Sequence, residues 1–201
     1  MAVIAGDLRV GPDTGRVVIK TSRAGLAAVA GHDLTIEVTR WSARIEVPGE
    51  ADGGISAAKV TAELDLGSLA VREGTGGARS LTDADRRDIE ATARRILTSG
   101  GGALARFSSS RVIPSAAGGA IEGTLTLHGR SQPARLQVSA PAPGRYRGST
   151  TIVQSAFGIT PYKGLFGALR LRDEVVAEFD LDLNRAAEDD PAAPGEPAES
   201  A

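Results

Sequence analysis

The chain has 201 residues, and none of them is cysteine. Disulfide bonds, thiolate nucleophiles and cysteine-based metal sites are therefore excluded, and stability cannot depend on an oxidising compartment. The first ten residues also lack the basic cluster, apolar run and small-residue cleavage site of a secretory signal peptide. These absences predict a cytoplasmic protein.

Long apolar runs and excess positive charge are missing too. No run of about 18 apolar residues occurs, the minimum for a membrane-spanning helix, so we expect a soluble protein whose contact with membranes is at most transient. The formal charge is -2, which leaves no broad basic surface to neutralise phosphates. Nucleic acid is therefore not expected as a partner.

Only two histidines are present, His32 and His128, and neither lies at metal-ligand spacing from a second histidine or a carboxylate pair. We expect neither a metal nor a cofactor. His32-Asp33 resembles half of a proton relay, but no G-x-S-x-G motif supplies a nucleophile. The turn habits of Gly31 and Asp33 favour a structural histidine instead.

Alternation of apolar and polar residues with a period of two indicates strands. The Gly- and Pro-containing residues 11–15 form a turn that is expected to join residues 3–10 and 16–21 as a hairpin. Residues 34–38 and 41–47 form either two strands or one long bent strand. Further strands are predicted at residues 59–66, 105–113, 121–128, 135–140, 146–154 and 174–183. Strands with mostly short connections predict an antiparallel sheet that closes into a barrel or sandwich.

One segment, residues 83–98, has helical spacing of its apolar residues. Thr82 is its expected N-cap, and acidic residues in the first turns and Arg94 and Arg95 in the last agree with the helix dipole. We expect this helix to cover an open end or edge of the sheet. From residue 186 on, Ala, Glu, Asp and Pro dominate without periodicity, which predicts a disordered acidic tail over residues 186–201 after one domain of residues 1–185.

Two other segments invite a functional interpretation. The glycines at positions 74, 76 and 77 precede the helix, but Arg79 stands where a dinucleotide fingerprint needs glycine, so a linker is favoured over a phosphate site. Residues 157–169 gather Phe157, Tyr162 and Phe166 in a chain with only 3% aromatic residues. This segment is either a plug at one barrel end or a lid that contacts ligand.

Several motifs together resemble a known family. They are Phe107-Ser108-Ser109-Ser110, Gly123 to Gly129 with Pro133, Gln154 to Ile159, and Asp173-Glu174-Val175, in the order that the YceI-like polyisoprenoid-binding family shows. The residues Gly31 to Leu34 and Val71 to Gly77 further resemble an actinobacterial-type branch of it. The resemblance implies a lipocalin-like antiparallel barrel of about eight strands with a helix, and a long isoprenoid or other lipid inside it. It implies no catalytic residue.

The expected function is binding, and carriage or sequestration, of a polyisoprenoid, isoprenoid quinone or fatty-acyl compound, with no enzymatic activity. We expect the apolar wall or lid to include Trp41, Phe107, Phe157, Tyr162 and Phe166, and the polar head group to lie near His32 or Lys163. The small Val, Ile, Leu and Ala side chains leave either a tunnel or a packed interior.

Two other functions remain open: a protein-interaction module with a packed barrel, and an enzyme that uses His32, Asp33 and a serine or Lys163. Edge strands of a partly open barrel also offer a route to a homodimer.

Overall fold

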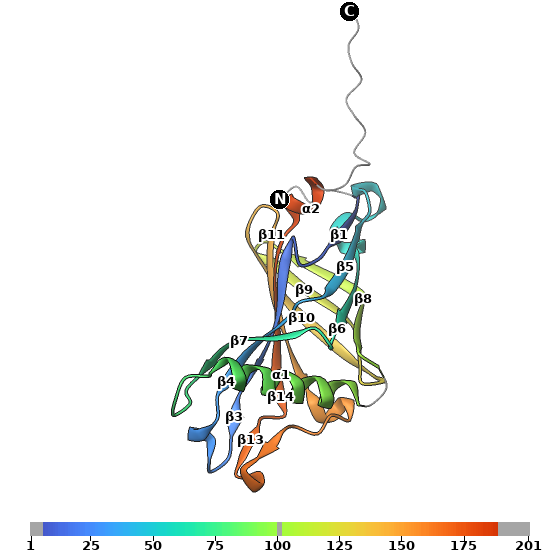
Figure 1. Ribbon diagram of the computed structural model, residues 1–201. Coiled ribbons are helices and arrows are strands. Elements are labelled where there is room, and N and C mark those ends of the chain that lie inside the picture. The colour runs from blue at the N-terminus through green and yellow to red at the C-terminus, as the bar shows by residue number, and fades with distance from the viewer. Residues whose placement is uncertain (1–5, 100–101, 189–201) are drawn as a thin grey trace, which may run out of the picture.

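The computed structural model describes residues 6–99 and 102–188, and one strongly curled antiparallel sheet dominates it (Figure 1). The strands of this sheet, in chain order, are β1 (Gly6–Val10), β2 (Gly15–Thr21), β4 (Asp33–Val38), β5 (Trp41–Val47), β6 (Lys59–Asp65), β7 (Leu69–Thr75), β8 (Leu104–Ser115), β9 (Gly118–Leu127), β10 (Arg130–Ala142), β11 (Arg145–Val153) and β14 (Glu174–Asp182). Their spatial order is β1-β5-β6-β8-β9-β10-β11-β14-β2-β4-β7. The expected mainly β, antiparallel barrel is confirmed.

Apart from β1, the strands at the two ends of the spatial order belong to one bent hairpin, which closes the sheet into a barrel. One arm runs through β4 and β5, and the other through β6 and β7, so that β4 pairs with β7 and β5 with β6. The Thr39 N–H donates to the Ser68 carbonyl and the Asp65 N–H to the Arg40 carbonyl, both at 3.0 Å, which carries the pairing through the bend. With each bent arm counted as one strand, eight strands form a hydrogen-bonded circuit, and β1 lies outside it on β5.

The expectation that residues 3–10 and 16–21 pair as a hairpin is wrong. The turn itself forms, since the Thr14 N–H donates to the Gly11 carbonyl at 3.0 Å. Strand β1 pairs with β5, however, while β2 pairs with β14 and β4. The turn residues determine only the reversal of the chain, whereas the partner of each strand depends on which distant apolar face it covers. Residues 3–5 lie outside the described residues.

Strand β10 begins five residues before its predicted start at residue 135 and contains Pro133. Proline lacks an N–H and is normally confined to positions where the ladder needs none. The first residues of β10 pair with β9 alone, because pairing with β11 begins only at Gln137. One side of the ladder is therefore free at Pro133, which is why the proline does not end the strand.

Helix α1 (Asp83–Thr98) has the predicted bounds and a capping box, in which Thr82 and Asp85 each bond the backbone N–H of the other. It covers the edge of β7 that has no neighbouring strand, because β7 is the last strand of the sheet (Figure 1). The Glu90 carboxylate accepts from the Val71 N–H at 2.8 Å, and Arg94 donates to the Leu69 carbonyl at 2.8 Å. Side chains of the helix thus satisfy the backbone groups that a neighbouring strand would otherwise bind.

A second, three-stranded sheet lies at one end of the barrel, with the order β12 (Lys163–Gly164), β13 (Leu169–Leu171) and β3 (Arg23–Ala24). We call this the small-sheet end. Helix α2 (Leu183–Glu188) lies at the opposite end and contacts β1 and β11. Its Ala186 is buried in the core, so the last element extends past the predicted boundary at residue 185. Residues 189–201 of the predicted tail lie outside the described residues.

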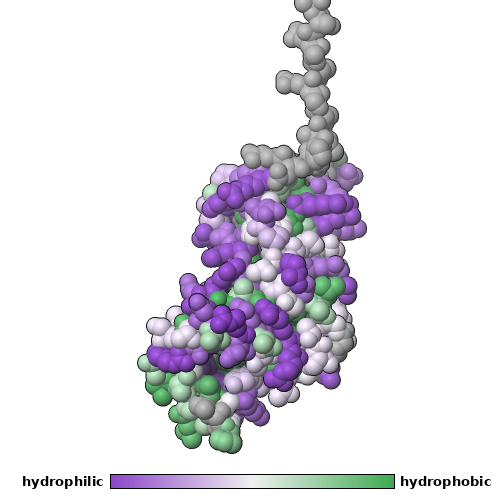
Figure 2. All heavy atoms as spheres, in the orientation of Figure 1, coloured by the Kyte–Doolittle hydropathy of each residue, from purple (hydrophilic) through white to green (hydrophobic). Residues whose placement is uncertain are grey.

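The outer face of the sheet is mostly hydrophilic (Figure 2). Ion pairs between neighbouring strands are frequent on it, among them Arg44 with Asp7, Arg106 with Glu63 at 2.6 Å, and Arg147 with Asp180 at 2.8 Å. The hydrogen bonds that Arg44 donates lower the pKa of Asp7. No helix among the described residues combines the length and hydropathy that crossing a bilayer requires.

We predict that Glu90→Ala destabilises the protein by about 1–3 kcal/mol, because it leaves the partly buried Val71 N–H without an acceptor. Glu90→Gln keeps an acceptor at this position and is the matched control. Urea unfolding of both variants measures the difference. Equal stabilities of the two variants would contradict this role of the hydrogen bond between Glu90 and β7.

The start of helix α1 makes stability depend on pH. Hydrogen bonds from Arg79 and Thr82 lower the pKa of Asp85 below its usual 3.8. Because the folded-state pKa is lowered, this contribution to stability is present above the unfolded-state pKa and is lost as pH falls below about 4. We therefore expect the thermal unfolding midpoint of Asp85→Asn to fall less steeply below pH 4 than that of the unmodified protein. The control is Asp83→Asn, a change in the same helical turn, which should alter this slope less. An unchanged slope in Asp85→Asn would contradict this.

Candidate ligand cavity

A large cavity of about 1560 Å³ runs through the interior of the barrel. It exceeds the roughly 300–1,000 Å³ of most small-molecule sites. His32 and Tyr162 line it at the small-sheet end, and Pro143 and Asn184 at the opposite end. Along β14, Val175 and Leu181 both line it, and six residue steps of strand span about 20 Å. The cavity is therefore elongated as well as large.

The strands keep the cavity open because many inward positions hold small residues. Alternation along each strand directs one set of side chains inward, and most of that set is aliphatic. The alanines that line the cavity from the strands and their flanks include Ala43, Ala58, Ala62, Ala105, Ala120, Ala134 and Ala177. An inward methyl group fills little of the lumen, so the walls enclose space instead of packing against each other.

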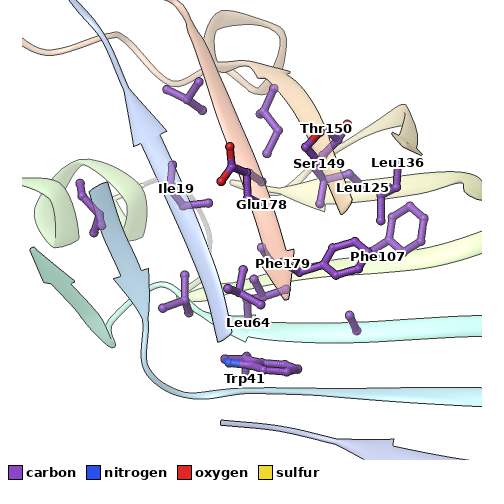
Figure 3. Close-up of a pocket in the computed structure, with 18 of the residues that line it drawn as sticks. Ile19, Trp41, Leu64, Phe107, Leu125, Leu136, Ser149, Thr150, Glu178 and Phe179 are labelled. Carbon is purple, nitrogen blue, oxygen red and sulfur yellow. The ribbon is translucent and has the colours of Figure 1, made fainter. Parts of the chain in front are cut away.

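Two large aromatic rings lie against the wall instead of across the lumen. Phe107 of β8 and Phe179 of β14 are both cavity residues (Figure 3). The ring of Phe107 lies over Gly123, where an added Cβ would come within 2.7 Å of it. The ring of Phe179 lies over Gly148, with a corresponding distance of 2.4 Å. These two glycines provide the depth that lets the rings lie flat.

The seven residues expected at the site separate into two groups. Trp41, Phe107, Tyr162 and His32 line the cavity. Phe157 lies outside the lining and is buried in a core cluster with Leu125, Leu127 and Ile159. It is the last residue of the short 3-10 helix Gln154–Phe157, which follows β11. That these residues bind ligand stays a prediction.

Phe166 and Lys163 also lie outside the cavity lining. The side chain of Phe166 is fully exposed, and Lys163 is exposed on β12. The segment of residues 157–169 is thus neither a simple plug nor a simple lid. It contributes Phe157 to the core, Tyr162 and Leu169 to the cavity, and Phe166 to the surface.

The sequence interpretation missed several lining residues. Phe179 is one of them, and its alternation with the inward Leu181 was a usable signal. Helix α1 contributes Ile89, Ala93 and Ile96 to the lining, which follows from the apolar face that predicted the helix. Strand β7 was also missed as a strand, together with the very short β3, β12 and β13.

Polar groups gather at the small-sheet end of the cavity. The His32 Nε2 lies 2.7 Å from the Arg79 carbonyl, and the imidazole ring packs over Gly77. Arg79 in turn donates to Asp85 at 2.6 and 2.8 Å. All three side chains contribute to the lining, so this mouth carries charge and hydrogen-bonding groups next to an apolar lumen.

The arrangement around His32 does not form a proton relay. The Asp33 carboxylate accepts from the Arg23 N–H at 2.8 Å, and the imidazole bonds a backbone carbonyl. Among the hydrogen bonds of residues 6–99 and 102–188, none joins His32 to Asp33 or to a serine. The same residues contain no group of three His, Asp or Glu side chains suited to a metal ion.

Comparison with known proteins bears on both the fold and the family. The crystal structure of Burkholderia cenocepacia BcnA superposes with a TM-score of 0.56 at 16% identity, over 83% of this chain and 94% of that chain. A Campylobacter jejuni YceI protein gives a TM-score of 0.41 at 18% identity, over 62% of this chain and 70% of that one. At such identities the likeness to BcnA shows the fold alone. No curated protein matches the chain.

The family itself follows from a model that describes a YceI-like domain and matches residues 9–183. The match includes every strand from β2 to β14 and helix α1, hence all of the cavity lining except Leu8 and Asn184. That family is known for binding polyisoprenoid or lipid in a barrel. The chain belongs to the YceI-like family.

Proposed function

We propose that this protein binds a long apolar molecule in the barrel cavity and carries or sequesters it. The compound class is a polyisoprenoid, an isoprenoid quinone or a fatty-acyl compound. The observation that supports this most strongly is the cavity itself, which is elongated, lined mainly by aliphatic side chains and about 1560 Å³ in volume. Trp41, Phe107 and Tyr162 are the proposed aromatic contacts.

The energy of burial favours long chains. Each buried methylene contributes about 0.8 kcal/mol, whereas association costs roughly 4–15 kcal/mol in lost freedom of motion. About ten buried methylenes therefore only begin to give useful affinity. An acyl chain in one leaflet spans roughly 15 Å, half of a bilayer core of about 30 Å. A cavity of about 20 Å along β14 accommodates such a chain in full.

We infer that the polar end of the ligand lies at the small-sheet end. Tyr162 lines the cavity there and is also 39% exposed, so its side chain reaches from the lumen to solvent. His32, Arg79 and Asp85 surround the same mouth. His32 is the proposed polar neighbour of a head group. Lys163, which is next to Tyr162 in sequence, stays a predicted contact from outside the lining.

The alternatives find less support. A packed barrel, which the interaction-module hypothesis assumed, does not fit a cavity of this volume. The enzyme hypothesis needs a relay through His32 and Asp33, and their hydrogen bonds lead to Arg79 and Arg23 instead. Cytoplasmic location and a homodimer through an edge strand stay predictions.

We predict that Ala177→Phe removes most of the lipid that copurifies with the protein, because a phenyl ring at this inward position fills the lumen. Val176→Phe adds the same ring to the neighbouring residue of β14, which does not line the cavity, and is the matched control. Native mass spectrometry and organic extraction of both variants measure the bound lipid. Equal lipid content in two folded variants would place the ligand elsewhere.

The orientation of the ligand has its own test in the two tyrosines of the chain, which line the cavity near opposite ends. Tyr162→Phe should weaken binding of stearic acid about fivefold, the value of one hydrogen bond of about 1 kcal/mol. Tyr146→Phe should leave that affinity unchanged. The opposite ranking in a fluorescence competition assay would place the head group at the α2 end.

A further inference from the structure

The small-sheet end carries an apolar surface that nothing in the described residues covers. Leu26, Val29 and Phe166 are exposed by 101%, 69% and 113%, and they are the three most exposed large apolar side chains in the described residues. We call these three residues the apolar tip. Figure 2 shows hydrophobic residues gathered at the end of the molecule where Figure 1 places β3 and β13.

The apolar tip comes from two loops that are bonded together. Ala24 pairs with Arg170, and the Ala27 N–H donates to the Ala168 carbonyl at 3.0 Å. Leu26 and Val29 are thus held on one loop, and Phe166 on the other, by contacts between their backbones. The two loops form one end surface instead of two independent projections.

The conformation of Phe166 points to a role outside the barrel. Its φ of 54° lies in the left-handed region, which is costly for a bulky residue and which glycine or asparagine adopts more readily. A fully exposed ring gains no packing energy that would offset this cost. Such a residue becomes favourable when a partner removes the ring from water.

Cations flank the apolar tip and lack ion-pair partners. Lys163, Arg170 and Arg172 are exposed, and none of them forms an ion pair within the described residues. Two carboxylates near these loops in sequence, Asp33 at the start of β4 and Asp173 between β13 and β14, accept hydrogen bonds from backbone N–H groups. This contrasts with the barrel wall, where arginines are commonly paired with acidic side chains.

We propose that the apolar tip docks on the surface of an anionic lipid bilayer. Exposed apolar side chains flanked by lysine and arginine match an interface in which the chains enter the headgroup boundary and the cations contact lipid phosphates. The two loops adjoin the cavity mouth, because Gly31, Tyr162 and Leu169 line the cavity. Docking here places that mouth against the membrane, so a lipid passes between bilayer and lumen with little exposure to water.

This use of the surface rests on the proposed carriage function, but membrane docking is measured separately. The test is flotation of the full chain with vesicles of equal parts phosphatidylglycerol and phosphatidylcholine. The double variant Leu26→Ser, Phe166→Ser should lower the partition coefficient about tenfold or more, since two apolar side chains no longer enter the interface. Leu104→Ser removes a partly exposed leucine of β8, outside the two loops, and should leave partitioning unchanged.

A second set of variants tests how much the cations contribute to vesicle binding. Lys163→Gln and Arg170→Gln should each weaken partitioning about fivefold, and added salt should weaken that of the unmodified protein. Lys59→Gln removes an exposed cation of β6, outside the two loops, and should have no effect. Vesicles of phosphatidylcholine alone should bind poorly.

Three results would overturn the proposal: no flotation of the unmodified protein, flotation unaffected by the tip variants, or equal losses in the Leu104 and Lys59 controls. Bound lipid in the cavity distinguishes the two proposals. Flotation that depends on the apolar tip, in a protein that holds no lipid, would support membrane docking and contradict carriage.

Discussion

The hydrogen bonds between helix α1 and the edge of β7 are the interaction on which the cavity depends. The sheet turns through a bent hairpin and ends at β7, where one side of the strand has no neighbour. Glu90 and Arg94 satisfy the Val71 N–H and the Leu69 carbonyl, and the apolar face of the same helix closes the lumen. One helix therefore protects the sheet edge and completes the apolar wall. A strand in its place would have continued the ladder without supplying Ile89 and Ile96 to the cavity.

The width of the lumen is the second constraint, and it follows from the residues that face inward. Alanines on the strands leave room, and Gly123 and Gly148 let the rings of Phe107 and Phe179 lie along the wall. If the walls packed against each other, the barrel would be more stable but would have no cavity for an apolar ligand. His32, Arg79 and Asp85 gather at the small-sheet mouth, where the apolar tip and its unpaired cations also lie. Ligand recognition and membrane docking are thus proposed for the same end of the barrel.

Local patterns predicted the elements well and the partners of the strands poorly. The bounds of helix α1 follow from capping residues and apolar spacing within its own sixteen residues. The partner of β1 depends on β5, which is more than thirty residues away in sequence, and no turn residue encodes that choice. Trp41 and Phe107 could be predicted at the cavity because alternation along a strand determines whether a side chain points inward. Phe157 and Phe166 lie in an aperiodic connection, whose sequence does not indicate where the side chains point. Whether small residues leave a cavity depends on the spacing of the walls, which the sequence pattern does not contain.

Trp41 provides the most direct test of the central claim, because it is the only tryptophan and lines the cavity. Bromine quenches indole fluorescence only at short range, so a titration with dibrominated stearic acid reports a chain inside the barrel. The account predicts saturable quenching of Trp41 at one chain per protein, and its loss in Ala177→Phe. Binding of the same fatty acid, detected by mass spectrometry without any quenching of Trp41, would contradict it.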